Sequence, residues 1–155
     1  MTEPPRILMV CLGNICRSPM AQGVLEARAA AAGLAVAVDS AGVGGWHQGE
    51  GPDPRAAAAA ARRGYAIADQ RARQVRGGDF DAFDVILGMD ESNLAALERA
   101  RPEAARARLA LLLDHAPGAE REIPDPYYGG ADGFDRVLDL IEAGVDGLIA
   151  ALRRG

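Results

Sequence analysis

The sequence predicts an α/β protein with three layers, in which a four-stranded parallel sheet carries helices on both of its faces. Two observations lead to this prediction. Short apolar runs alternate with longer helical segments along the chain, and this alternation is typical of parallel sheets with right-handed crossovers. The first apolar run, Ile7-Leu8-Met9-Val10, is uninterrupted, as expected for a strand that is covered on both faces.

Length and composition narrow the range of functions. The chain has 155 residues, of which 49% are hydrophobic and 25% charged, so we expect a single domain over residues 1–155. A net charge of -5 argues against a general nucleic-acid binder. There is no apolar run long enough to span a membrane, and no secretory signal. With only two cysteines, we expect a cytoplasmic protein whose thiols are free, without nucleic-acid or membrane partners.

The elements follow from local signals in the sequence. Ser18 is predicted to cap the first helix and Pro19 to occupy its first turn, and Gly33 to end it. Asp53 and Pro54 are predicted to start the next helix. The expected strands are 6–10, 34–38, 83–87 and 108–113, and the expected later helices are 55–63, 90–100 and 134–152, with 67–75 as loop or short helix.

The loop between the first strand and the first helix carries the residues that indicate chemistry. It reads Cys11-Leu12-Gly13-Asn14-Ile15-Cys16-Arg17-Ser18. A loop of this length at a helix N-terminus can turn its N–H groups inward and bind an anion of phosphate shape. Arg17 would hold two phosphate oxygens with its planar fork, and the same field would stabilise a Cys11 thiolate as a nucleophile. If the sequence showed only a Cys and an Arg at this spacing, the Cys would more often be a buried residue that serves packing. Here the preceding strand, the residues of the loop and the start of the helix all fit the catalytic interpretation.

A thiolate that attacks a phosphate ester also requires an acid to protonate the leaving oxygen. Asp125 is the best candidate, because Pro124 and Pro126 restrict its backbone. Tyr127 and Tyr128 would form an apolar wall beside it. Parallel strands place their carboxyl ends at one edge, so Asp125 and the Cys11 loop are expected to meet there.

These motifs resemble those of the low-molecular-weight protein tyrosine phosphatases. The resemblance covers nearly the whole chain and implies a phosphotyrosine phosphatase I-like fold. It also implies hydrolysis of phosphotyrosine proteins or small aryl phosphates, with inorganic phosphate as product and without metal or cofactor. The segments that carry it are Cys11–Pro19, Asp39–Gly42, Pro52–Ala56, Ala72–Gln74, Met89–Asp90 and Asp125–Tyr127.

The resemblance further implies individual roles. Cys11 would become a phosphocysteine, Arg17 would bind the phosphoryl oxygens, and Asp125 would act as acid and then as base. Ser18 would hydrogen-bond the sulfur and ease its departure, and Cys16 would form a reversible disulfide with Cys11 under oxidation. The residues expected to brace the loop or contact substrate are Leu12, Gly13, Asn14, Ile15, Cys16, Ser18, Ser40, Trp46, Tyr127 and Tyr128.

Three other functions fit the same loop less well. An arsenate reductase would need cysteines beyond Cys16, and there are none. An arginine phosphatase of this family would carry Thr in place of Ile15, whose apolar side chain suits a phenyl ring. A phosphate-binding module without catalysis would be expected to lose Cys11 or Asp125.

Many animal members carry His where this chain has Gln70, and we expect Gln70 to give equivalent support to Asn14.

Overall fold

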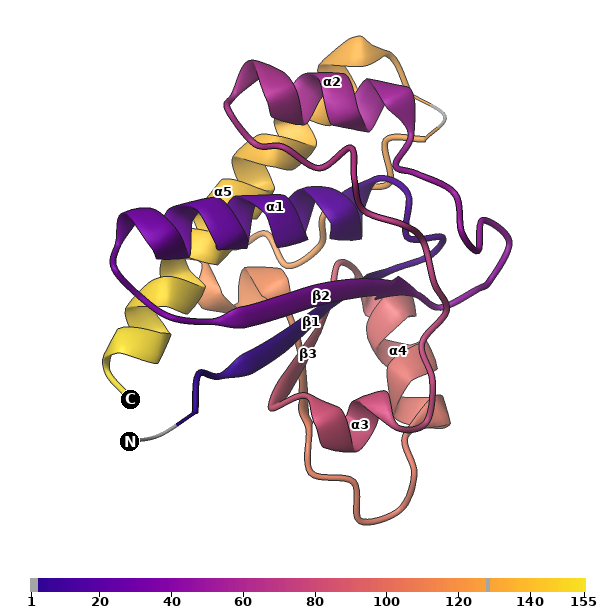
Figure 1. The fold of residues 1–155 in the computed structure, drawn as a ribbon, viewed down its shortest axis with the longest axis vertical. Coiled ribbons are helices and arrows are strands. Elements are labelled where there is room, and N and C mark those ends of the chain that lie inside the picture. The colour runs from indigo at the N-terminus through magenta and orange to yellow at the C-terminus, as the bar shows by residue number, and fades with distance from the viewer. Residues whose placement is uncertain (1–2, 128) are drawn as a thin grey trace.

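The computed structural model describes residues 3–127 and 129–155 and contains a parallel sheet with helices on both faces (Figure 1). The strand order is β2-β1-β3-β4, so the predicted fold class is confirmed. The elements in chain order are β1 (Arg6–Cys11), α1 (Arg17–Ala31), β2 (Ala37–Gly42), α2 (Pro54–Arg62), α3 (Asp79–Ala82), β3 (Val85–Gly88), α4 (Glu91–Ala100), β4 (Arg108–Leu111), the 3-10 helix η1 (Leu112–His115) and α5 (Ala131–Arg153).

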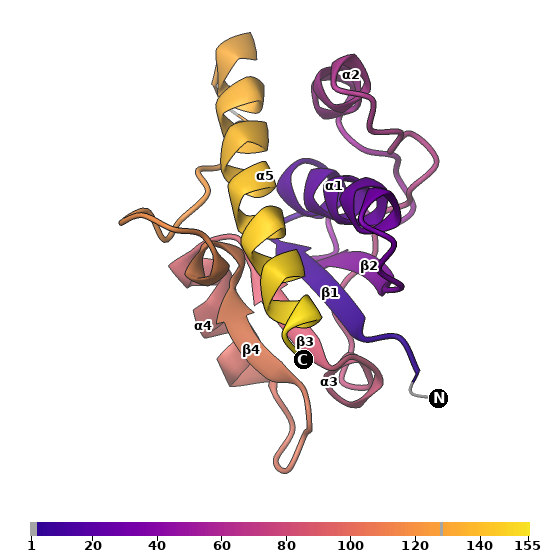
Figure 2. The ribbon, with the colours of Figure 1, turned by 90° about the vertical axis from the view of Figure 1, so that its left-hand side faces the viewer.

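The central strand β1 divides its side chains between two apolar clusters. Ile7 and Met9 belong to the cluster that α1, α2 and α5 cover, whereas Leu8 and Val10 belong to the cluster on the face of α3 and α4. Figure 1 shows these two groups of helices on opposite sides of the sheet, and Figure 2 shows α5 running along the sheet beside α1. All four side chains are fully buried, which explains why the strand is apolar throughout.

The second strand differs from its prediction. Residues 34–36 precede the ladder, and β2 instead spans Ala37–Gly42 opposite Arg6–Cys11. Its last residues, Ser40, Ala41 and Gly42, are buried and lie beyond residue 38, where the strand was expected to end. Backbone pairing with β1 up to Cys11 outweighs the weak strand propensity of these small residues. The consequence is that Ser40 lies beside the Cys11 loop.

The second half of the chain also departs from expectation. The strand β3 spans Val85–Gly88 rather than 83–87, and α5 spans Ala131–Arg153 rather than 134–152. The fourth strand stops at Leu111 rather than 113, because the Asp114 carboxylate accepts a hydrogen bond from the Leu111 N–H and turns the chain into η1. The short helix α3 was not predicted, since two glycines precede it and it has only four residues. The ends of α1 and α2 follow the prediction, with Gly33 at φ +69° and Gly64 at φ +88°.

The carboxyl ends of the strands define where a site can form. The loop after β1, the connection after β2, the start of α4 after β3 and the segment that follows η1 all lie at this edge of the sheet. In the described part of the chain, no helix combines the length and the apolar character needed to cross a membrane.

Candidate active site

A cavity of about 310 Å³ opens at this edge of the sheet. Three connections form its wall: the loop after β1, the Gly-rich loop after β2, and the proline-rich segment before α5. Its lining residues are Cys11, Leu12, Gly13, Ile15, Cys16, Arg17, Trp46, His47, Asp125 and Tyr127. Residues far apart in sequence, including the expected nucleophile, arginine and acid, therefore face one space.

The loop after β1 is held from outside by its carbonyl groups. Asn14 adopts φ +60°, a left-handed conformation that lets the chain curl tightly. Three of the loop carbonyls accept hydrogen bonds from neighbouring segments, an arrangement compatible with an anion-binding nest. These outward hydrogen bonds run from Val43 N–H to Cys11 O at 2.9 Å, from Gly44 N–H to Leu12 O at 3.0 Å, and from Asp53 N–H to Ile15 O at 2.8 Å.

Cys11 lies at the base of the cavity and is 3% exposed. Its Sγ atom is 3.0 Å from the hydroxyl oxygen of Ser18. The expectation that Ser18 caps α1 is wrong: the helix begins at Arg17, Cys16 is the N-cap, and no side chain caps it. Ser18 lies in the first turn, where its buried hydroxyl contacts the sulfur and, at 3.5 Å, the Ala41 carbonyl oxygen instead of capping the helix.

A layer of polar side chains supports the loop from behind. The Asn14 side-chain amide donates hydrogen bonds to Ser18 Oγ at 2.8 Å and to Ser40 Oγ at 3.0 Å. Ser40 in turn lies 3.4 Å from the Gln70 side-chain oxygen, whose amide nitrogen donates to Pro19 O at 3.0 Å. The side chains of Asn14, Ser18 and Ser40, all predicted site residues, therefore support the loop and are not in the cavity wall. Gln70 was expected to support Asn14, but it contacts Ser40 and Pro19 and is connected to Asn14 through Ser40.

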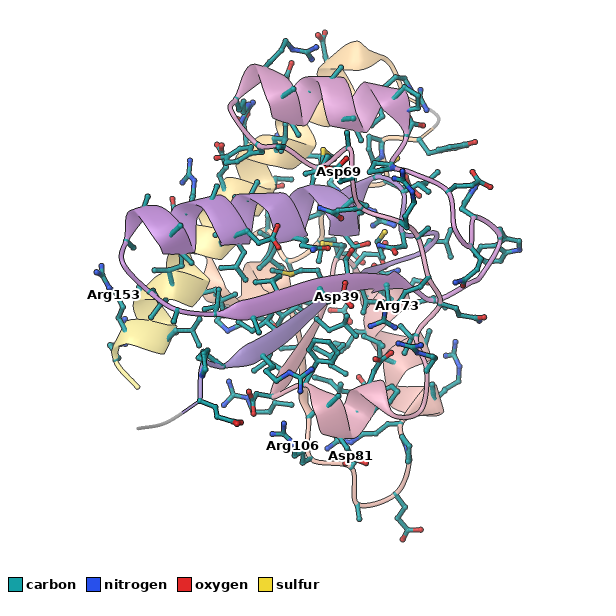
Figure 3. The ribbon with its side chains drawn as sticks, viewed as in Figure 1. Asp39, Asp69, Arg73, Asp81, Arg106 and Arg153 are labelled. Carbon is teal, nitrogen blue, oxygen red and sulfur yellow. The ribbon has the colours of Figure 1, made fainter. Side chains whose placement is uncertain are left out.

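A second layer fixes Asn14 itself. The Asn14 side-chain oxygen accepts a hydrogen bond from the Arg73 N–H at 3.0 Å. The Arg73 guanidinium binds both carboxylate oxygens of buried Asp79, at 3.0 and 3.1 Å, and also Asp39 at 3.1 Å. Figure 3 shows Arg73 beside Asp39 below the loop. Sequence reasoning did not find Asp79, because the pairing depends on the unpredicted helix α3.

Arg17 is buried and has a defined orientation. Its Nη1 atom donates to Asp90 Oδ2 at 2.6 Å and to Ile123 O at 2.9 Å, and its Nη2 atom lies 3.6 Å from Asp125 Oδ2. Burial acts to lower the pKa of Arg17, but the nearby Cys11 sulfur and Asp90 raise it, and the net shift is upward. The guanidinium is therefore a permanent cation in the cavity wall.

Asp90, which the sequence places at the start of a helix and in a segment that carries the family resemblance, has two roles in the structure. One carboxylate oxygen accepts from the Asn93 N–H at 2.8 Å and caps α4, while the other binds Arg17. The position of Asp90 directly after β3 was a signal for this contact, since that places it at the same edge as the Cys11 loop.

The Asp125 side chain is 37% exposed and lines the cavity together with Cys16 and Arg17. Its Oδ1 atom accepts a hydrogen bond from the Tyr127 N–H at 3.0 Å, which leaves Oδ2 toward Arg17. The flanking prolines and this turn give the carboxyl a defined direction. The arrangement suits an acid that delivers a proton into the cavity.

The cavity mouth is apolar. Leu12, Trp46 and Tyr127 are exposed by 45%, 69% and 37%, and Ile15 lies deeper. His47 was not among the predicted site residues, yet it lines the cavity and packs against Gly13, where a Cβ atom would lie 3.1 Å from the imidazole. Its Nδ1 atom is 3.1 Å from Glu50. Tyr128, also predicted, lies outside the described residues.

Cys16 is a free, buried thiol that lines the cavity together with Cys11. Burial raises the pKa of Cys16 to about 12, and the negative charges of Asp53 and Cys11 act in the same direction. At neutral pH the Cys16 side chain is therefore protonated. The Cys11 sulfur, by contrast, lies within hydrogen-bond distance of the Ser18 hydroxyl.

Comparisons with known proteins agree with this geometry. A family model described as low molecular weight phosphotyrosine protein phosphatase matches residues 6–155. A low molecular weight protein-tyrosine-phosphatase of Streptomyces coelicolor is 48% identical over 154 residues, which cover 96% of this chain and 93% of that protein.

Solved structures match equally well over their lengths. The crystal structure of a protein tyrosine phosphatase from Entamoeba histolytica, with Hepes in its active site, has a TM-score of 0.93 and 38% identity, covering 97% of this chain and 98% of that one. A Drosophila arginine phosphatase has a TM-score of 0.89 and 30% identity, covering 94% and 96%. Because the family model and these relatives span nearly the full chain, the protein belongs to the low molecular weight phosphotyrosine protein phosphatase family.

Proposed function

We propose that the protein hydrolyses phosphotyrosine in proteins, and small aryl phosphates, through a phosphocysteine intermediate and with release of inorganic phosphate. The observation that carries this proposal is the cavity in which Cys11, Arg17 and Asp125 face one space. The apolar mouth formed by Leu12, Trp46 and Tyr127 supports an aromatic leaving group, because a phenyl ring can lie against these side chains.

In the first step, the Cys11 thiolate attacks phosphorus while the loop N–H groups and Arg17 bind the phosphoryl oxygens. The bond between phosphorus and the tyrosyl oxygen breaks, and Asp125 donates its proton to that oxygen. In the second step, the Asp125 carboxylate takes a proton from water as the water oxygen attacks phosphorus. The bond between phosphorus and sulfur then breaks, which returns the Cys11 thiolate and releases phosphate.

The polar contacts of the loop support both steps. Ser18, 3.0 Å from the sulfur, stabilises negative charge on it when it attacks and when it leaves. Asp90 holds the Arg17 fork from one side, so that its remaining N–H groups are directed toward the phosphate. The chemistry depends on a reduced Cys11, and this supports a reducing, cytoplasmic location and a sensitivity to oxidants.

The direct test is hydrolysis by purified protein of three peptides that carry phosphotyrosine, phosphoserine and phosphoarginine, in buffer with a metal chelator. We expect turnover of the phosphotyrosine peptide and a lower kcat/KM by at least about 100-fold for phosphoserine, whose phosphorus would stop short of the sulfur. Cys11→Ser should bind phosphate but lose turnover. Preferred turnover of phosphoarginine, or sustained activity of the Cys11→Ser variant, would contradict the proposal.

A further inference from the structure

Arg55, in the first turn of α2, lies outside the cavity wall but contacts two of the segments that form it. Its guanidinium binds Asp53, with Nε 3.1 Å from Oδ1 and Nη2 2.9 Å from Oδ2. These hydrogen bonds hold the pKa of Asp53 below its ordinary value, so the pair remains ionic at neutral pH. The Asp53 N–H donates to Ile15 O at 2.8 Å, which connects Arg55 to the phosphate-binding loop.

The same guanidinium contacts the segment that carries Asp125. Its Nη2 atom donates to the Tyr127 carbonyl at 2.9 Å. Its central carbon lies 5.5 Å from the centre of the Tyr127 ring and 5.0 Å from that of the Phe134 ring in α5. The Tyr127 N–H in turn donates to Asp125 Oδ1 at 3.0 Å. Arg55 is thus two contacts away from the carboxyl group that faces the cavity.

The connection between η1 and α5 is held by contacts on both sides of Asp125. On the N-terminal side of Asp125, Ile123 is fixed by its N–H bond to Met89 O and by Arg17, which donates to the Ile123 carbonyl. On the C-terminal side, Arg55 holds the Tyr127 carbonyl and ring. The two fixed points lie on either side of Asp125. Pro124 and Pro126 restrict the backbone between these points, so that fixing them also restricts the position of Asp125.

We infer that Arg55 is a positioning residue for Asp125, tying the backbone of the acid-bearing segment to the phosphate-binding loop through Tyr127 and Asp53. This inference rests on the proposed role of Asp125 in proton transfer. Lysine cannot replace arginine in this role, because a single ammonium group cannot bind a carboxylate with two nitrogens, donate to a carbonyl and stack on two rings together.

Leaving-group dependence separates a positioning role from a merely structural one. Loss of proton donation slows esters of weakly acidic phenols much more than esters of acidic phenols. We therefore compare kcat/KM for phenyl phosphate and p-nitrophenyl phosphate in wild type, Asp125→Ala, Arg55→Met and Arg55→Lys. Arg55→Met keeps an apolar stem against the rings and removes the guanidinium. Arg62→Met, an exposed arginine in the same helix, is the matched control.

We expect Arg55→Met to lower kcat/KM for phenyl phosphate by about 10- to 100-fold and for p-nitrophenyl phosphate by less than about threefold. Arg55→Lys should also slow phenyl phosphate more than p-nitrophenyl phosphate. Arg62→Met should leave the ratio of the two kcat/KM values as in wild type. Since both substrates are measured on one preparation, the ratio of the two values does not depend on the fraction of folded protein. In an Asp125→Ala background, Arg55→Met should leave the ratio unchanged, because its effect passes through Asp125.

The outcomes distinguish the positioning role of Arg55 from the proton-donating role of Asp125. If Asp125→Ala changes the ratio and neither Arg55 variant does, the inference about Arg55 is overturned while the role of Asp125 stands. If Arg55→Met changes the ratio further in the Asp125→Ala background, Arg55 acts by another route and the inference also fails. If Asp125→Ala itself leaves the ratio unchanged, the proton donor is another group and both proposals fall.

Discussion

The Sγ atom of Cys11 lies 3.0 Å from the Oγ atom of Ser18, within a part of the molecule from which solvent is excluded. Ser18 is fully buried, and its hydroxyl also accepts a hydrogen bond from the Asn14 amide at 2.8 Å. Because Asn14 donates to it, the hydroxyl can donate its own proton, and two acceptors lie within reach: the Cys11 sulfur at 3.0 Å and the Ala41 carbonyl oxygen at 3.5 Å. Donation to the nearer sulfur would make this contact a hydrogen bond to the atom that is proposed to attack phosphorus.

Ser18→Ala is expected to lower kcat by about 10- to 100-fold, since a hydrogen bond to a charged group contributes roughly 1.5–3 kcal/mol. Both chemical steps should be slower, and the step in which the sulfur leaves phosphorus should be slowed most. Rapid quenching followed by mass spectrometry would then detect more phosphorylated enzyme during turnover than in wild type. An unchanged kcat would show that the hydroxyl is only a packing contact.

Asp90 permits a substitution that separates its two contacts. Asp90→Asn keeps an oxygen for the cap of α4, where Asn is as good a cap as Asp, but removes the ionic partner of Arg17. We expect the inhibition constant for inorganic phosphate to rise about tenfold, corresponding to about 1.4 kcal/mol, with little change in thermal stability. Asp90→Ala should show the same loss of affinity and additionally about 1 kcal/mol of lost stability from the missing cap.

Unchanged phosphate affinity in Asp90→Asn would mean that the Ile123 carbonyl alone suffices to orient Arg17.

Asp79 and Asp39 bind the same Arg73 guanidinium but differ in burial, which makes them a matched pair. The Asp79 side chain is 5% exposed and the Asp39 side chain 47%. Asp79→Ala is expected to lower the free energy of unfolding by about 3 kcal/mol, because it leaves a part-buried cation without its main partner. Asp39→Ala should cost less than about 1 kcal/mol, as exposed ion pairs do. Urea unfolding of both variants gives the comparison.

Asp79→Ala should also lower activity, since the Arg73 N–H orients Asn14 and Asn14 orients Ser18. Equal stability losses for the two variants would contradict the assignment of Asp79 as the principal support of this layer.

Much of this fold could be predicted because its signals are local. The apolar run before Cys11, the cap at Asp53 and the glycines at 33 and 64 each specify an element by themselves. The register of β2 could not be predicted, because Ser40 and Gly42 become strand residues only through pairing with β1. Residue types and spacing predicted that Cys11, Arg17 and Asp125 share a site, and all three line one cavity in the structure.

The supports of that loop were less evident, since their partners are distant in the sequence. The contact of Arg17 with Asp90 spans 73 positions, and that of Asn14 with Arg73 spans 59. Ser18 shows why a local rule fails here. Serine before proline at a helix start normally caps the helix, but its hydroxyl is directed at a buried sulfur, and the helix begins without a side-chain cap.

The high pKa of Cys16 makes a prediction about stability in alkali. The thiol of an unfolded chain ionises near pH 8.5, whereas burial raises the pKa of Cys16 in the folded protein to about 12. A group whose folded pKa is raised stabilises the fold fully below the unfolded pKa and loses that contribution as pH rises toward the folded value. Wild type should therefore lose stability between about pH 8.5 and 12 more steeply than Cys16→Ala, measured by urea unfolding across that range.

The high pKa of Cys16 also affects the response of the enzyme to peroxide. Peroxide converts the Cys11 thiolate to a sulfenic acid, and attack by the Cys16 sulfur would form a disulfide as the oxygen leaves in water. The attacking species is a thiolate, and Cys16 is protonated at neutral pH. We therefore expect the disulfide to form slowly at pH 7 and faster at pH 9, followed by mass spectrometry of peroxide-treated protein. Dithiothreitol should then restore wild-type activity, and restore Cys16→Ser much less, because its sulfenic acid proceeds to irreversible acids. Equal recovery of both proteins, with no disulfide between Cys11 and Cys16, would make Cys16 a packing residue beneath the loop.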